Sequence, residues 1–197
     1  AVLGSIQPQP LDFKRDGTLD LEQVSSAVKP DDFHFAKTRL LCLENTHSGK
    51  ALPFDYFARA EMCAKNHGLS LHLDGARIFN AAIKTGCTAA DIGRFFDTVS
   101  VCLSKGLGAP VGAVLCGNRM LIDRARRWRK VLGGGMRQAG ILAAAGIYAL
   151  NNNIERLQHD HDHAHLLAQR LEKIGGLQVE YDSAQTNMVF VSVPDEA

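Results

Sequence analysis

The sequence predicts an α/β fold with a mostly parallel sheet flanked by helices, followed by the start of a small C-terminal α+β subdomain. Apolar runs of strand length alternate with helical segments over the first 117 residues. Two of these runs, 69–74 and 100–105, end at charged residues and enclose a helical segment that begins at Thr88. Strand, helix and strand in this order form a right-handed crossover between parallel strands.

Proline and glycine set most of the boundaries between these segments. Pro30 stops a helix that begins near Leu21, Pro53 begins the next helix, and Gly68 ends it. The expected strands cover residues 1–6, 40–44, 69–74, 100–105, 113–116, 179–181 and 188–191, and the expected helices cover 21–28, 54–67, 88–96, 119–132 and 136–173, of which the last is long or kinked.

The composition is that of a globular protein in a reducing compartment. Of the 197 residues, 46% are hydrophobic, and the net charge of +1 argues against nucleic acid as a partner. No apolar run approaches the ~20 residues that span a bilayer, and no signal peptide is recognisable, so we expect no membrane association. The five cysteines are scattered, and Cys42 and Cys102 are expected inside buried strands. We therefore expect reduced thiols and a cytoplasmic protein.

Asp74 and Lys105 are the first candidate functional residues, because each one follows a predicted strand. Parallel strands end at the same edge of a sheet, and this edge is where open α/β sheets bind ligands. A lysine and an aspartate there suit pyridoxal 5'-phosphate (PLP), since the lysine holds the aldehyde and the aspartate pairs with the ring nitrogen. Two structural alternatives stay open: a solvated, idle Lys105, and an Asp74–Arg77 ion pair that caps the strand.

Three segments around these positions resemble a known family. They are residues 72–77 (HLDGAR), 102–112 (CLSKGLGAPVG) and 133–138 (GGGMRQ), which occur in the expected order and at the expected spacing. Together they closely resemble the low-specificity L-threonine aldolases, which belong to the β-eliminating-lyase group of fold-type I PLP enzymes. The likeness extends over nearly the whole chain, from Ala1 to Phe190.

The resemblance implies a fold-type I PLP-dependent transferase-like architecture and a function. The implied reaction is retro-aldol cleavage of L-threonine or L-allo-threonine to glycine and an aldehyde, with Lys105 as the Schiff-base lysine and Asp74 on the ring nitrogen. Arg77 would bind the substrate carboxylate through its planar fork of donors. His34, which by itself is typical of a packed residue between two aromatics, would lie near the substrate's β-hydroxyl. Arg137 would bind the PLP phosphate across a subunit interface, which implies a homo-oligomer, a dimer of dimers.

The resemblance also divides the chain. Residues 1–150 are expected to form a PLP-binding large domain that lacks its N-terminal part, and 151–197 a long helix and the start of an incomplete small domain. The family's phosphate loop, the residue that stacks on the cofactor ring and a C-terminal arginine have no recognisable counterpart, so we expect an internal fragment of a longer enzyme. Two alternatives remain: another PLP reaction such as β-elimination or racemisation, and a fragment that cannot hold PLP.

Three further motifs and one residue complete the list of candidates. The histidines of 159–165 include i, i+4 pairs, but their helix is amphipathic, so we expect surface histidines and no metal site. The basic stretch 124–130 includes Trp128, yet its charges point in several directions on a helix, which disfavours nucleic-acid binding. The glycines 133–135 either form a flexible turn or open a helix whose free amides bind an anion. His47, beyond a predicted strand, has no assigned role.

Overall fold

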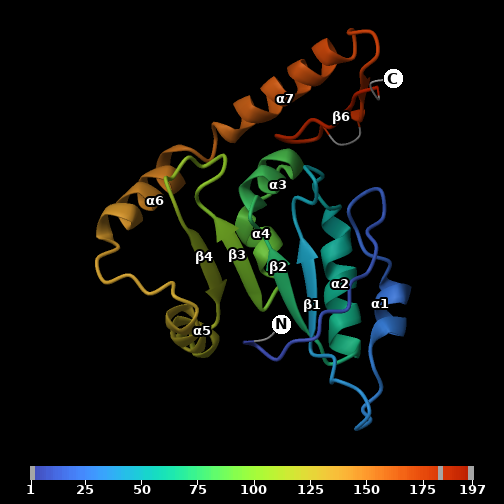
Figure 1. The fold of residues 1–197 in the computed structure, drawn as a ribbon, viewed down its shortest axis with the longest axis vertical. Coiled ribbons are helices and arrows are strands. Elements are labelled where there is room, and N and C mark those ends of the chain that lie inside the picture. The colour runs from blue at the N-terminus through green and yellow to red at the C-terminus, as the bar shows by residue number, and fades with distance from the viewer. Residues whose placement is uncertain (1–2, 182–183, 195–197) are drawn as a thin grey trace.

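A four-stranded mixed sheet forms the centre of the computed structural model, which describes residues 3–181 and 184–194. The strands β1 (Leu40–Glu44), β2 (Ser70–Asp74) and β3 (Thr98–Cys102) are parallel, and β4 (Ala113–Gly117) runs antiparallel to β3. They lie side by side in chain order, β1-β2-β3-β4 (Figure 1). The predicted mostly parallel sheet is confirmed, and the three parallel strands bring their carboxyl ends to one edge.

Four helices cover one face of this sheet. They are α1 (Leu21–Ala27), α2 (Phe54–Asn66), α3 (Ile78–Thr85) and α4 (Ala89–Gly93). Apolar side chains of the strands alternate along the chain, so that Leu71 and Leu73 of β2 point into a core with Phe57 of α2. Thr88 caps α4 as predicted, through a reciprocal capping box with Asp91, but the helix ends at Gly93 rather than 96. The helix α3 was not predicted.

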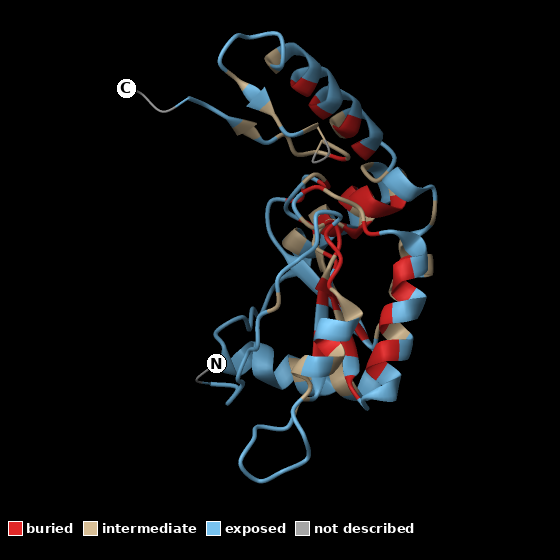
Figure 2. Cartoon of the chain, turned by 90° about the vertical axis from the view of Figure 1, so that its right-hand side faces the viewer, coloured by how far each residue is buried: buried red, intermediate tan, exposed pale blue. Residues whose placement is uncertain are grey.

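The opposite face of the sheet lies outside this core. Cys42 is exposed and Cys102 only half-buried, because the alternation of side chains places both on the face that α1–α4 do not cover. The prediction that both thiols are buried is therefore wrong. Buried residues concentrate where helices meet the sheet, whereas the N-terminal segment on the other side is exposed (Figure 2). Residues 3–5 of the expected first strand form turns, and its residues 1–2 lie outside the described residues.

The rest of the described chain is mainly helical. It comprises α5 (Arg119–Val131), α6 (Gly140–Asn152), α7 (Leu157–Leu171) and a two-stranded antiparallel sheet of β5 (Gln178–Val179) and β6 (Val191–Ser192). The single long helix expected over 136–173 is thus two helices, separated at residues 153–156. In Figure 1, α7 lies above the carboxyl edge of the central sheet and next to α3. The division into domains at residue 150 stays a prediction. Within the described ranges, no helix is both long and apolar enough to cross a membrane.

Candidate active site at the carboxyl edge of the sheet

Asp74 is the last residue of β2 and lies at the centre of the candidate site. Its neighbours in register are Glu44 at the end of β1 and Ser100 in β3. The carboxylate is exposed and accepts a hydrogen bond from the backbone amide of Ala76 (3.0 Å), which closes a turn beyond the strand. The Asp74 carbonyl accepts a hydrogen bond from Asn45 N (2.9 Å), so the segments that follow β1 and β2 are joined at this edge.

Lys105 follows β3 in a tight turn. The Lys105 carbonyl accepts a hydrogen bond from Gly108 N (2.8 Å), and the Leu103 carbonyl accepts one from Ala109 N (3.0 Å). Gly108 has a φ of 76°, which a glycine adopts without strain. The Lys105 side chain is exposed and makes no hydrogen bond or ion pair with any described residue. The turn thus presents an unpaired primary amine at the edge where Asp74 ends β2.

Three buried polar atoms at the same edge have no hydrogen-bond partner among the described residues. They are Arg77 Nε, Asn45 Nδ2 and Thr46 Oγ1. Arg77 precedes α3 and makes no ion pair with Asp74 in the described part of the chain, so the alternative of an Asp74–Arg77 cap is not realised. Buried polar groups in native proteins are nearly always paired. This cluster is therefore where we expect a polar ligand to bind.

The positive charges of Lys105 and Arg77 both act on the thiol of Cys102. Burial acts to raise the pKa of its thiol, but hydrogen bonding with Ser104 and the charges of Lys105 and Arg77 outweigh burial, so the pKa is lowered. Cys102 Sγ lies 3.4 Å from Ser104 Oγ. Sequence reasoning missed this thiol as part of the site. The alternation of β3, which places Cys102 on the same face as Ser100, was the signal that could have found it.

His72 lies on the same sheet face as Asp74, two residues earlier in β2. Its Nδ1 is 2.8 Å from Thr98 Oγ1 of β3. Burial lowers the pKa of His72, although the nearby charge of Asp74 acts in the opposite direction. The imidazole is therefore neutral at pH 7. His72 adds no positive charge to the sheet face that carries Asp74.

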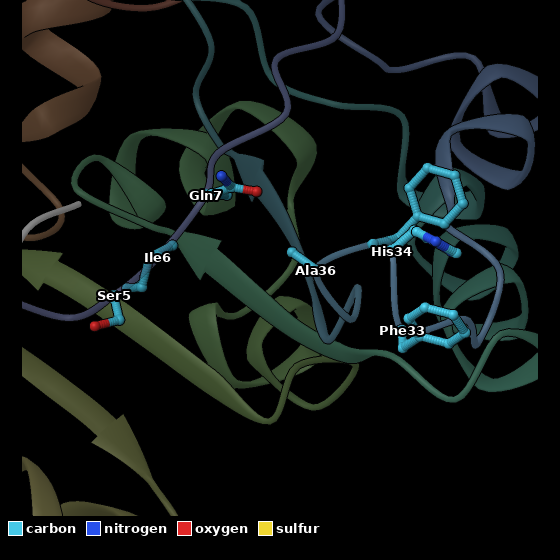
Figure 3. Close-up of a pocket in the computed structure, with 7 residues that line it drawn as sticks. Ser5, Ile6, Gln7, Phe33, His34 and Ala36 are labelled. Atoms are coloured by element: carbon cyan, nitrogen blue, oxygen red, sulfur yellow. The ribbon is translucent and has the colours of Figure 1, made fainter.

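The structure does not bring His34 to this edge. His34 lies in the loop before β1, on the amino side of the sheet, and its Nδ1 pairs with Asp32 (2.7 Å). Together with Phe33 it lines a shallow pocket whose other wall is the N-terminal segment of Ser5 and Ile6 (Figure 3). The proposed contact of His34 with the substrate hydroxyl stays a prediction that this chain's own geometry does not support.

Arg137 lies on the exposed loop between α5 and α6 and not in one of the segments that directly follow β1, β2 and β3. The preceding glycines do not open a helix. Gly133 N donates to Lys130 O (3.1 Å) and Gly134 N donates to Arg129 O (2.8 Å), so these amides end α5 instead of facing an anion. Of the two alternatives for these glycines, a turn and an anion-binding helix N-terminus, this pair of amides realises the turn, because the next helix begins only at Gly140.

His47 packs against an aromatic ring, and most of the α7 histidines lie at the surface. The His47 ring stacks on Phe13 with centroids 3.9 Å apart, and its Nδ1 pairs with Glu44 (2.8 Å). No group of three potential metal ligands occurs within the described residues. His159, His163 and His165 are exposed on α7. His161 is the exception: it is buried, at 6% exposure, against α3.

A family model described as beta-eliminating lyase matches residues 1–194. This chain belongs to the beta-eliminating lyase family. It is 57% identical over 196 residues to the low specificity L-threonine aldolase of Escherichia coli K12, covering 100% of this chain and 58% of that protein. It is 44% identical over 200 residues to the low-specificity L-threonine aldolase 1 of Arabidopsis thaliana, covering 99% and 56%. The chain thus spans less than two thirds of the length of these relatives.

Solved structures confirm the fold class. A candidate L-allo-threonine aldolase from Listeria monocytogenes EGD-E superposes with a TM-score of 0.80 at 26% identity, over 96% of this chain and 51% of that one. A PLP-dependent aminotransferase from Streptococcus suis 89-1591 shares the fold alone, with a TM-score of 0.67 at 19% identity, over 93% and 48%. The predicted fold-type I architecture is therefore correct.

Proposed function

We propose that the protein containing this chain is a PLP-dependent threonine aldolase, which cleaves L-threonine or L-allo-threonine to glycine and acetaldehyde. The observation that carries the proposal is that Asp74 and Lys105 follow neighbouring parallel strands at one sheet edge, within a chain 57% identical to a low specificity L-threonine aldolase. The alignment covers 58% of that relative's length.

The residues present fit PLP as a cofactor. The unpaired, buried Arg77 Nε and Thr46 Oγ1 need a polar partner, and the exposed Lys105 amine has none among the described residues. Bound PLP would supply an electrophilic aldehyde and a ring that accepts electrons when a bond at the substrate's α-carbon breaks. An aspartate at the ring nitrogen strengthens this property, because its negative charge keeps a proton on that nitrogen.

Each of the three residues at this edge would perform a separate task. The Lys105 amine would hold the cofactor's aldehyde carbon until a substrate amine replaces it. Asp74 would accept the ring N–H, with its second role in the Ala76 turn keeping the carboxylate oriented. Arg77 would bind the substrate carboxylate, and a bidentate guanidinium fixes orientation better than an ammonium does. Fixing the carboxylate decides which bond at the α-carbon aligns for cleavage.

One of the remaining assignments requires a second copy of the protein. Arg137, on the exposed loop between α5 and α6, would bind the cofactor phosphate in a neighbouring subunit's site, and His34 would lie near the substrate's β-hydroxyl. Support comes from α5, in which no residue is buried and which leaves Trp128 and Val131 exposed. Exposed large apolar side chains such as these would be covered in a subunit interface. A cytoplasmic homotetramer, built as a dimer of dimers, is the corresponding proposal for the assembly.

The product of the reaction tests the function. Full-length protein incubated with PLP and L-threonine should release glycine and acetaldehyde in equal amounts. β-Elimination would instead release ammonia and 2-oxobutanoate, and racemisation at the α-carbon would change only the stereochemistry. Loss of activity in Lys105→Ala, with retention in the exposed control Lys173→Ala, would assign the reaction to this edge. Ammonia without glycine would overturn the proposed aldolase in favour of an eliminating lyase.

A further inference from the structure

A buried polar pair joins α3 to α7. Asn80 of α3 is 3% exposed and His161 of α7 is 6% exposed, and their side chains meet across 81 positions of sequence. Asn80 Nδ2 donates to His161 Nε2 at 3.1 Å. Because an amide nitrogen can only donate, the imidazole nitrogen must accept, so His161 is neutral with its proton on Nδ1. Neither the proposed reaction nor the sequence motifs use this pair.

The surroundings of His161 keep the ring neutral. Burial lowers its pKa, and the ammonium of Lys84 on α3 acts in the same direction. Two carboxylates on its own helix, Asp160 and Asp162, act in the opposite direction and do not overcome the burial. Protonation below the ordinary histidine pKa would place two donors against each other in a buried site, and the hydrogen bond to Asn80 would be lost.

Both helices of the pair also contact the candidate site. The helix α3 begins directly after Arg77. The helix α7 packs on the Lys105 turn. Its first residue, Leu157, belongs to the same buried apolar cluster as Leu103 and Leu107 of that turn. A Cβ added at Gly106 would lie only 2.7 Å from Leu157 Cδ2, which shows how closely α7 and the turn approach each other. Any sliding of α3 against α7 would therefore change the position of Arg77 relative to Lys105.

We propose that Asn80 and His161 form a positioning pair that fixes α3 against α7 and thereby sets the spacing between Arg77 and the Lys105 turn. The pair does this as a directional polar contact buried between the two helices, where a shift of one helix leaves a buried donor unpaired. The consequence for catalysis rests on the proposed function, whereas the coupling between the two helices does not.

Hydrogen exchange without PLP tests the coupling independently of any activity. Three variants of the full-length protein are compared with the wild type. His161→Leu removes the hydrogen-bond acceptor, whereas His161→Gln retains an acceptor that cannot be protonated. His159→Leu is the control, because His159 is exposed on the same helix. In His161→Leu, amides of 75–80 and 103–109 should exchange about tenfold faster, with those of α2 unchanged. His161→Gln and His159→Leu should match the wild type. Uniformly faster exchange throughout, α2 included, would make the pair a general stability contact and overturn the proposal.

The dependence on pH adds a second, independent readout. After correction for intrinsic exchange, protection of 103–109 in the wild type should stay constant above about pH 6.5 and fall as the pH is lowered below that value, because burial lowers the pKa of His161, and His161→Gln should not show this fall. An equal fall in both proteins would refute the role of the imidazole, even if His161→Leu proved too unstable to purify.

Turnover then distinguishes this inference from the proposed function. If the wild type cleaves L-threonine, His161→Leu should raise KM several-fold, because a displaced Arg77 binds the substrate carboxylate poorly, and His161→Gln should restore it. If the wild type releases no aldehyde, the proposed function fails, while the exchange results still decide the coupling. Restored exchange in His161→Gln with a KM as high as that of His161→Leu would contradict the catalytic part of the inference.

Discussion

Replacing Gly106 by alanine measures how tightly the Lys105 turn packs on α7. The added Cβ would lie 2.7 Å from Leu157 Cδ2 and 3.3 Å from Asp160 Oδ2, and Leu157 is only 1% exposed. The φ of Gly106 is not among the positive values of the chain, so the strain comes from this contact rather than from the backbone. Overpacking of this kind costs about 1–3 kcal/mol. In a protein of this size about 2 kcal/mol lowers Tm by about 4–8 °C.

Thermal unfolding without cofactor measures this cost. The matched control is Gly175→Ala, since a Cβ there meets nothing within 4 Å, and its Tm should stay within about 2 °C of the wild type. A second measurement follows the reaction of Lys105 with PLP, trapped by borohydride and quantified by mass spectrometry, which should slow in Gly106→Ala alone. Equal Tm values for Gly106→Ala and Gly175→Ala would refute the close packing of α7 on the turn.

Four further changes test the proposed site. Lys105→Ala should abolish both the absorbance of lysine-bound PLP and turnover, and a variant that keeps both would exclude this lysine. Asp74→Asn keeps the Ala76 hydrogen bond but loses the charge, so kcat should fall about 10–100-fold with Tm nearly unchanged; an unchanged kcat would make the carboxylate structural. Arg77→Lys should raise KM for threonine more than it lowers PLP affinity; titrating the variant and the wild type with threonine and, separately, with PLP decides this. His34→Phe should leave PLP absorbance intact, lower kcat/KM about 5–100-fold and alter the threonine to allo-threonine ratio; parallel loss of both rates and of PLP would identify a packing residue.

Local sequence patterns determined the positions of the strands and of several helices. The prediction of a strand over 40–44, of a strand ending at Asp74 and of a helix beginning after Pro53 matches the structure, because these depend on neighbouring residues. The parallel direction of the two strands, which a strand–helix–strand unit implies, then sufficed to place Asp74 and Lys105 at one edge. The helix α3 was missed because its N-cap position is Arg77, which makes no side-chain capping bond and so leaves no start signal.

Tertiary contacts decided what the pattern left open. A period of two or 3.6 residues shows which side chains share a face, but not which element covers that face. Cys42 is exposed because α1–α4 pack on the other face of the sheet, and His161 is buried because Asn80, 81 positions away, lies opposite it. The breaking of the predicted long helix at 153–156, which sets α7 beside the Lys105 turn, has the same origin. Sequence alone thus placed the candidate site residues at an edge, and long-range packing decided which groups surround and orient them.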